Sequence, residues 1–273
     1  MCELMALSAN VPTDIRFSFS GLCPRGGVTG PHRDGFGICF YEHGGLREFK
    51  DYLPSCQSAI AEFLKSYAIR SKTILSHIRQ ANVGGVSLEN THPFQRELWG
   101  KVWTFAHNGQ MPIEQVPQPS YYQPVGTTDS EKIFCWILSE LRSAFNADVC
   151  ISQVSAYLHS LCNRLNALGI NNILLSDGDA IFAFCSTKLH WVARKAPFGE
   201  AQLRDCDLSI DFASVNSDDH VSVVIATEPL TKNEQWLAMK SGEGRMFVNG
   251  ESSWHDFGPE IIHKKSEPTK IAS

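Results

Sequence analysis

The chain has 273 residues and a mass of 30.4 kDa, enough for one large domain or two small ones. Apolar residues make up 43% and charged residues 19%, as in an ordinary globular chain, and no apolar run approaches the ~18 residues of a membrane span. Lys and Arg number 24 against 29 Asp and Glu, and this net charge of −5 argues against a nucleic-acid-binding surface and against docking on an anionic membrane.

Apolar periodicity in the first half of the chain changes between strand-like and helical patterns. Gly44-Gly45 lies between two apolar runs and predicts a hairpin, and Thr13 is the expected N-cap of the first helix. The predicted elements, in chain order, are a strand over 2–8, a helix over 14–22, strands over 37–42 and 46–49, a helix over 57–67, and strands over 73–79 and 102–106.

The second half opens with two helical stripes and returns to strands. The predicted elements are helices over 129–145 and 154–168, then strands over 172–175, 180–185, 189–193 and 221–227. Because strands both precede and follow the helices, the order favours sheets with helices packed outside them over a Rossmann alternation. No glycine-rich dinucleotide or phosphate-binding motif occurs. We expect residues 1–262 to form one domain and residues 263–273 to be a flexible tail.

The nine cysteines are an odd number at irregular spacing, and the chain begins without a basic and apolar signal segment. This composition favours a cytoplasmic protein with reduced thiols over a disulfide scaffold. There is no Cys-x-x-Cys pair and no His-Glu-x-x-His motif, so the sequence predicts no metal site and no cofactor.

Cys2 is the first residue of chemical interest. If Met1 is removed, Cys2 carries a thiol together with a free α-amine, whose pKa of about 7.7–8.0 lies well below that of lysine. One residue can then supply a nucleophile and its own base. Taken alone, a cysteine at the second position is more simply explained as part of a buried strand.

Three later segments carry groups that could bind an amino acid and stabilise an oxyanion. Arg79 ends a predicted strand, where it is either a solvated strand end or a clamp for a carboxylate. Asn108-Gly109 is a turn signal, but an Asn amide and the adjacent backbone N–H can also stabilise an oxyanion. Asp129 precedes a predicted helix, where it either caps the helix or faces a substrate ammonium.

Several short segments, taken in order, form one pattern: Cys2-Glu3-Leu4, Asp34-Gly35-Phe36-Gly37, His77-Ile78-Arg79-Gln80-Ala81, His107-Asn108-Gly109, Thr128-Asp129-Ser130-Glu131 and, more weakly, Leu175-Ser176-Asp177-Gly178 and Ala226-Thr227-Glu228-Pro229-Leu230. The pattern resembles the glutaminase domain of the type 2 glutamine amidotransferases, a family of N-terminal nucleophile hydrolases. The last two segments look most like its small stand-alone YafJ-like subgroup. The resemblance extends to about residue 250.

The resemblance implies an α+β fold, a four-layer αββα sandwich of two antiparallel sheets. It implies that Cys2 is the nucleophile and that Asn108 and Gly109 form the oxyanion hole. It also implies that Arg79 binds the α-carboxylate of the substrate and Asp129 its α-ammonium. One departure concerns Asn82, where larger members of the family often have Thr.

Neighbouring polar residues are expected to support these groups. We expect His77 and His107 to act as strand-end supports, and the polar loop 32–34 to order the N-terminus, without direct roles in catalysis.

The resemblance implies that glutamine or another γ-glutamyl amide is hydrolysed through a γ-glutamyl thioester on Cys2. Two enzymatic versions stay open: outright hydrolysis of a γ-glutamyl amide larger than glutamine, or supply of ammonia to a separate synthase. A non-catalytic binding protein that keeps the fold is a third interpretation. It is disfavoured because such a protein has no need of the nucleophile.

Overall fold

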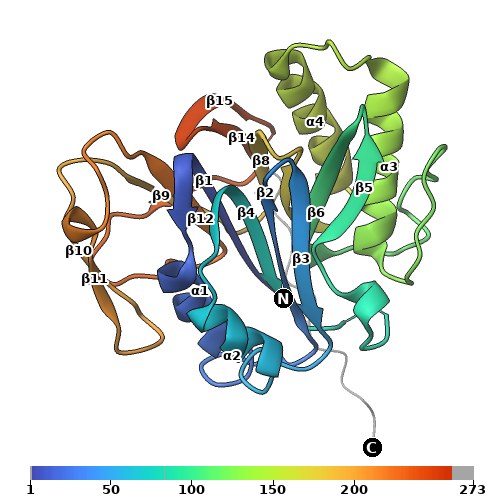
Figure 1. Ribbon diagram of the computed structural model, residues 1–273. Helices are drawn as coiled ribbons and strands as arrows, with labels where there is room; N and C mark the ends of the chain where they lie inside the picture. The colour runs from blue at the N-terminus through green and yellow to red at the C-terminus, as the bar shows by residue number, and fades with distance from the viewer. Residues whose placement is uncertain (1, 83, 260–273) are drawn as a thin grey trace, which may run out of the picture.

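Two antiparallel β-sheets face one another in the centre of the protein (Figure 1). The computed structural model describes residues 2–82 and 84–259. The strands are β1 (Glu3–Asp14), β2 (Phe36–Glu42), β3 (Gly45–Asp51), β4 (Arg70–Ile78), β5 (Phe94–Leu98), β6 (Lys101–Gln110), β7 (Ile170–Ser176), β8 (Ala180–Cys185), β9 (His190–Arg194), β10 (Glu200–Gln202), β11 (Ser209–Asp211), β12 (Ser222–Ala226), β13 (Leu237–Ala238), β14 (Glu243–Val248) and β15 (Glu251–Phe257). One sheet has the order β13-β9-β12-β1-β4-β2-β3 and the other β15-β14-β8-β7-β6-β5, while β10 and β11 form a separate pair.

Helices cover the outer face of each sheet. The α-helices are α1 (Arg16–Leu22), α2 (Ala59–Ser66), α3 (Asp129–Ala144) and α4 (Ile151–Asn166), and short 3-10 helices are η1 (Cys23–Arg25), η2 (Leu88–Asn90) and η3 (Phe212–Ser214). The first two α-helices lie against the seven-stranded sheet, and α3 and α4 lie against the six-stranded sheet (Figure 1). The layers therefore run helix, sheet, sheet, helix, which confirms the predicted αββα sandwich.

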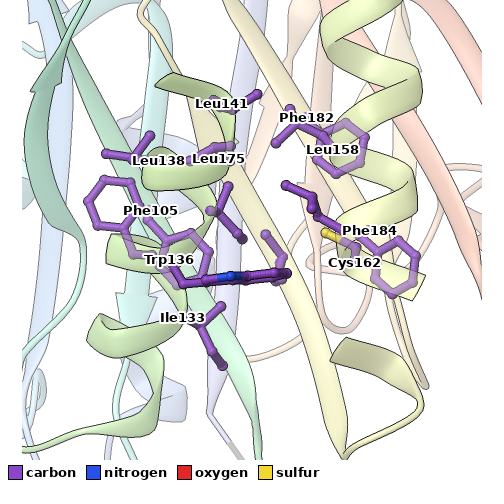
Figure 2. Close-up of a cluster of buried hydrophobic side chains, with 14 of the residues drawn as sticks. Phe105, Ile133, Trp136, Leu138, Leu141, Leu158, Cys162, Leu175, Phe182 and Phe184 are labelled. Atoms are coloured by element: carbon purple, nitrogen blue, oxygen red, sulfur yellow. The ribbon is translucent and has the colours of Figure 1, made fainter. Parts of the chain in front are cut away.

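Three clusters of buried apolar side chains hold the four layers together. The first fills the space between α3, α4 and the six-stranded sheet, where Phe105 stacks on Phe134 and Trp136 lies beside Ile133 (Figure 2). The second packs α1 and α2 on the seven-stranded sheet. The third lies between the two sheets and includes Leu4, Ala6, Leu75, Ala106, Leu174 and Ala183. Burial of these apolar side chains, at about 25 cal/mol per Å², is the main favourable term in folding.

Most of the predicted elements are present, with shifted ends. The hairpin turn lies at His43 and Gly44, both at positive φ, with Glu42 opposite Gly45. The predicted Thr13 cap is wrong: Thr13 and Asp14 stay extended because they pair with residues 70–71 of β4. Helix α1 consequently begins at residue 16, after Ile15 as N-cap.

Strand β1 lies in the middle of its sheet, between β4 and β12, although it begins at the third residue of the chain. The Leu4 N–H donates to Thr227 Oγ1 at 2.9 Å, and the Thr227 N–H donates to the Leu4 carbonyl at 3.1 Å. The first residues of β1 are thus held in place by Thr227, the residue that follows β12.

A buried arginine also holds this end of β1. Arg25 pairs with Glu3 at 2.9 Å and with Asp205 at 3.0 Å, and it donates to the carbonyls of Glu228 and Pro229 at 3.1 and 2.7 Å. Its side chain is 8% exposed and that of Glu3 is 11% exposed, so water screens this pair little.

Two sequence predictions concern residues outside this description. Met1 and the predicted tail 263–273 lie beyond the described residues, and the proposed domain boundary stays a prediction. All nine cysteines lie within the described residues, and none of them forms a disulfide. Among the helices of the described ranges, none combines the length and the apolar character needed to span a bilayer.

Replacing Arg25 tests the importance of this cluster. Arg25→Ala leaves the buried Glu3 carboxylate and the partly buried Asp205 carboxylate without their cation, so the free energy of unfolding should fall by about 3–5 kcal/mol. Urea unfolding followed by circular dichroism measures the change. The matched control is Arg16→Ala: the Arg16–Asp14 pair has side chains 41% and 29% exposed, and its loss should cost less than about 1 kcal/mol. Equal effects of the two substitutions would contradict the prediction.

Candidate active site

The alternation of side chains along the strands brings the predicted site residues to one layer. Successive side chains of a strand point to opposite faces. Leu4 and Ala6 lie between the sheets, so Cys2 continues that face of β1, and Arg79 likewise continues the face of Leu75 on β4. On the opposite sheet, Ala106 lies in the same layer, so Asn108 faces the space between the sheets.

The Cys2 thiol rests on the peptide that follows Arg79. The Gln80 N–H donates to Cys2 Sγ at 3.3 Å, and the thiol donates to the Gln80 carbonyl at 3.5 Å. Burial raises the pKa of Cys2, and the Gln80 N–H and the charge of Arg79 only partly oppose that shift. Because the reactive form of cysteine is the thiolate, attack by this thiol requires a base.

Arg79 presents its guanidinium at the end of β4 and is 2% exposed. It donates to the carbonyl of Gly85 at 2.9 Å and to that of Gly84 at 3.4 Å. Its backbone bonds to residues 34 and 35, and the Asp34 carboxylate accepts the Ala81 N–H at 2.7 Å. Residues 32–34 form the polar loop that was predicted to order the N-terminus. This loop thus orders the segment against which Cys2 lies.

Asn108 is completely buried, yet neither polar atom of its amide has a hydrogen-bond partner among residues 2–82 and 84–259. Such an orphan amide costs roughly 1–3 kcal/mol, so it is rare in folded proteins. The adjacent Gly109 has no room for a side chain, because a Cβ atom would lie 1.9 Å from the Ile170 carbonyl oxygen and 2.5 Å from His107 Nε2. A side-chain amide without a partner, next to a backbone N–H, offers the kind of donors from which an oxyanion hole can be built.

Asp129 occupies the first turn of α3, where a carboxylate is stabilised by the helix dipole. Its Oδ2 accepts the Met111 N–H at 2.9 Å, and its Oδ1 accepts the N–H of Ser130 at 2.9 Å. These bonds fix the carboxylate without exhausting its lone pairs, which number about four. The N-cap of α3 is Thr128, whose side chain accepts the Glu131 N–H, so the Asp129 carboxylate is not the capping group.

Three buried histidines lie behind these groups. His77 Nε2 is 3.1 Å from the His107 carbonyl oxygen, His107 Nδ1 is 2.8 Å from Ser130 Oγ, and the His77 and His92 rings stack with centroids 4.1 Å apart. Burial lowers the pKa of His77 to about 3 and also lowers the pKa of His92 and that of His107. All three are neutral at pH 7: His77 and His107 make hydrogen bonds, whereas His92 packs against His77 and its ring nitrogens have no partner among the described residues.

Four of the five predicted site residues line one small cavity: Cys2, Arg79, Gly109 and Asp129. Its volume is about 30 Å³, which is room for roughly two water molecules. Asn108 is the fifth predicted residue; its amide is completely buried in the layer between the sheets and does not line this cavity. A larger cavity of about 540 Å³ near α1 contains none of the predicted residues.

Eight further residues line this cavity without a predicted direct role, and Asn82, His92 and Ser130 are among them. Asn82 donates to Gln110 Oε1 at 3.4 Å, and both residues line the cavity. Position 82 is the one at which the sequence departs from the Thr expected from the resemblance. Ser130 belongs to the Thr128–Glu131 segment of the sequence pattern, but that pattern did not predict its hydrogen bond to His107. His92 precedes a proline in an irregular stretch, and nothing in its local pattern marks it. Within the described ranges, no group of three His, Cys, Asp or Glu side chains is arranged to hold a metal ion.

Comparison with known proteins identifies close relatives over most of the chain. The family model described as glutamine amidotransferases class-II matches residues 1–271. "Putative glutamine amidotransferase YafJ" of Escherichia coli is 53% identical over 92% of this chain and 99% of its own length. A protein of Haemophilus influenzae with the same family name is 43% identical over 92% of this chain and 85% of its own length.

Solved structures give the same picture. A crystal structure titled as a predicted glutamine amidotransferase from Pseudomonas aeruginosa has 47% identity and a TM-score of 0.75, over 93% of this chain and all of that one. The glutamine phosphoribosylpyrophosphate amidotransferase of Bacillus subtilis has 15% identity and a TM-score of 0.59, over 94% of this chain and 49% of that one. At that identity the likeness extends to the fold alone.

The neutral histidines predict how stability depends on pH. Unfolded His77 takes up a proton below pH 6.5, whereas the folded form does so only near pH 3, so the folded state becomes less stable as the pH falls through that window. In His77→Gln the free energy of unfolding should therefore fall by about 2.5 kcal/mol less between pH 6 and pH 4 than it does in the wild type. Urea unfolding at both pH values measures this. His43→Gln, in the exposed β2–β3 turn, is the control and should leave the pH dependence as it is in the wild type.

Proposed function

The chain belongs to the class-II glutamine amidotransferase family, and from that premise we propose that it hydrolyses the amide of glutamine or of another γ-glutamyl compound with Cys2 as nucleophile. The observation that carries the proposal is the buried, unpartnered amide of Asn108 on the layer that Cys2 also faces. An orphan amide is tolerated where a transient ligand completes its hydrogen bonds, and the oxyanion of an acyl-transfer intermediate is such a ligand.

The charges around the cavity suit a zwitterionic amino acid. Arg79 supplies a planar fork for the α-carboxylate, and Asp129 supplies a fixed carboxylate for the α-ammonium. Both side chains line the same small cavity as Cys2. With its α end held by these two charges, a substrate directs its γ-amide toward the thiol. Arg79 must then exchange its bonds with the Gly84 and Gly85 carbonyls for bonds with the substrate.

The reaction proceeds in two acyl-transfer steps. The Cys2 α-amine, freed by removal of Met1, takes the thiol proton as Sγ attacks the γ-carbonyl carbon. The oxyanion forms between the Asn108 amide and the Gly109 N–H, the C–N bond breaks, and the leaving amine takes up the proton. Water then attacks the γ-glutamyl thioester, which releases the γ-carboxylate and restores the thiol. The raised pKa of Cys2 makes the nearby base necessary.

Removal of the nucleophile is the first test. Cys2→Ala should reduce the release of amine from glutamine and from γ-glutamyl anilides by roughly 10³-fold or more. An uncleavable N-terminal extension should reduce it similarly, because it converts the α-amine into an amide. Intact mass spectrometry after treatment with 6-diazo-5-oxo-norleucine reports the covalent adduct. Cys56→Ala, which changes an exposed cysteine outside the cavity, should keep full activity. Full activity of the extended protein would exclude the α-amine as base.

Arg79→Lys tests the recognition of the α-carboxylate. Lysine keeps the charge but holds one oxygen at a time, so one charge-assisted hydrogen bond is lost. KM should therefore rise roughly 10- to 100-fold, with a smaller change in kcat. Steady-state kinetics with glutamine measure both. Arg33→Lys, at an exposed position of the neighbouring loop, is the control. If the wild type hydrolyses a substrate analogue without the α-carboxylate as well as glutamine, Arg79 has been given the wrong role.

A further inference from the structure

Asn172 is a buried asparagine of β7 that lies directly opposite Asn108 in the β6–β7 ladder. Its Oδ1 accepts three consecutive backbone N–H groups, from Ser186 at 3.1 Å and from Thr187 and Lys188 at 3.0 Å. Its Nδ2 donates to Thr187 Oγ1 at 3.0 Å and to the backbone carbonyl of Asn108 at 2.9 Å. The three N–H donors require the oxygen in this position, so the orientation of the amide is fixed.

The Asn108 carbonyl and the Gly109 N–H belong to one peptide unit. Because a trans peptide is planar, these two groups point in opposite directions. The carbonyl is directed to Asn172 on β7, so the Gly109 N–H is directed away from β7. On that side β5 pairs with residues 101–105 of β6 and does not reach Gly109. The N–H therefore points to the part of the strand that no ladder partner covers.

We propose that Asn172 is a positioning residue, which acts on the substrate through the Asn108–Gly109 peptide. Its hydrogen bond to the Asn108 carbonyl sets the direction of the Gly109 N–H and, by drawing electron density toward the carbonyl oxygen, strengthens that N–H as a donor. Direction matters because hydrogen bonds weaken steeply at poor angles. The inference rests on the proposed function, in which this N–H stabilises the oxyanion.

A purely structural role is the alternative, since Asn172 also organises the 186–188 turn. Two substitutions separate the roles. Asn172→Asp keeps an oxygen for the three N–H groups of the turn, and Thr187 can donate to the second oxygen, but the donor to Asn108 is replaced by an acceptor. Thr187→Val removes a partner of Asn172 in the turn and leaves the bond to Asn108 intact.

Kinetics of the purified enzyme with a γ-glutamyl anilide form the first half of the test. For Asn172→Asp we expect kcat to fall roughly 10- to 100-fold, less than the ~10²–10³ for complete loss of an oxyanion donor, with KM within about twofold. Alkylation of Cys2 by iodoacetamide forms no oxyanion, so its rate, followed on the N-terminal peptide by mass spectrometry, should be unchanged. Thr187→Val should stay within about twofold of wild type throughout. Unchanged kcat in folded Asn172→Asp, or a parallel fall in kcat and alkylation, would overturn the proposal.

Nuclear magnetic resonance supplies a readout that needs no turnover. The chain contains two Asn-Gly pairs, at 108–109 and 249–250, so labelling Asn with carbonyl ¹³C and Gly with ¹⁵N leaves two correlated signals. Asn172→Asp should shift the 108–109 signal and leave the 249–250 signal in place, which also verifies the fold. An unmoved 108–109 signal overturns the proposal. A wild type that hydrolyses no γ-glutamyl amide refutes the proposed function, whereas an active wild type with an indifferent variant refutes the role of Asn172.

Discussion

The face-to-face packing of the two sheets is the contact on which the rest of the structure depends. Each sheet contributes one side-chain layer to the interface, and small residues such as Ala6 and Ala106 let the sheets approach closely. Strand side chains alternate with a period of two, so a slip of one residue would turn the whole buried set outward. The same register that buries Leu4 and Leu174 therefore directs Cys2 and Asn108 into the shared layer. Stability and site geometry are set by one arrangement.

Charge is handled differently on the two sides of Cys2. Toward the start of β1, Arg25 neutralises Glu3 and Asp205 in a fully bonded cluster. Toward the cavity, Arg79 and Asp129 do not touch each other, and each is held by backbone groups instead. A cation and an anion kept apart by backbone hydrogen bonds retain the capacity to bind a zwitterion, whereas a direct ion pair would satisfy both charges within the protein. The three neutral histidines beside them add no further charge.

Periodicity was sufficient to predict most of the helices and strands and the packing of helices outside the sheets, because these elements bury regular apolar faces. The four-layer αββα order was implied by the family resemblance. Periodicity failed where tertiary pairing overrides local preference: Thr13 has the chemistry of a cap, yet β4 keeps it in the strand and its hydroxyl bonds to His220. Strand β15 is predicted by no pattern, since it is an edge strand with mostly exposed, polar residues. The roles of Cys2, Arg79, Asn108, Gly109 and Asp129 stay predictions that the geometry suits. Asn172 carried no local signal, because its partner Asn108 lies 64 residues earlier in the chain.

The central position of β1 has a consequence for the newly made chain. Its neighbours are β4, at residues 70–78, and β12, at residues 222–226. Strand β1 thus waits for one of its two partners while the chain as far as β12 is translated, on the order of 10–40 s at about 5–20 residues per second. Throughout that interval one edge of β1 has no partner strand, and the residues beside Cys2 remain accessible. The segment that follows Cys2 is therefore enclosed between two strands only after β12 has been made.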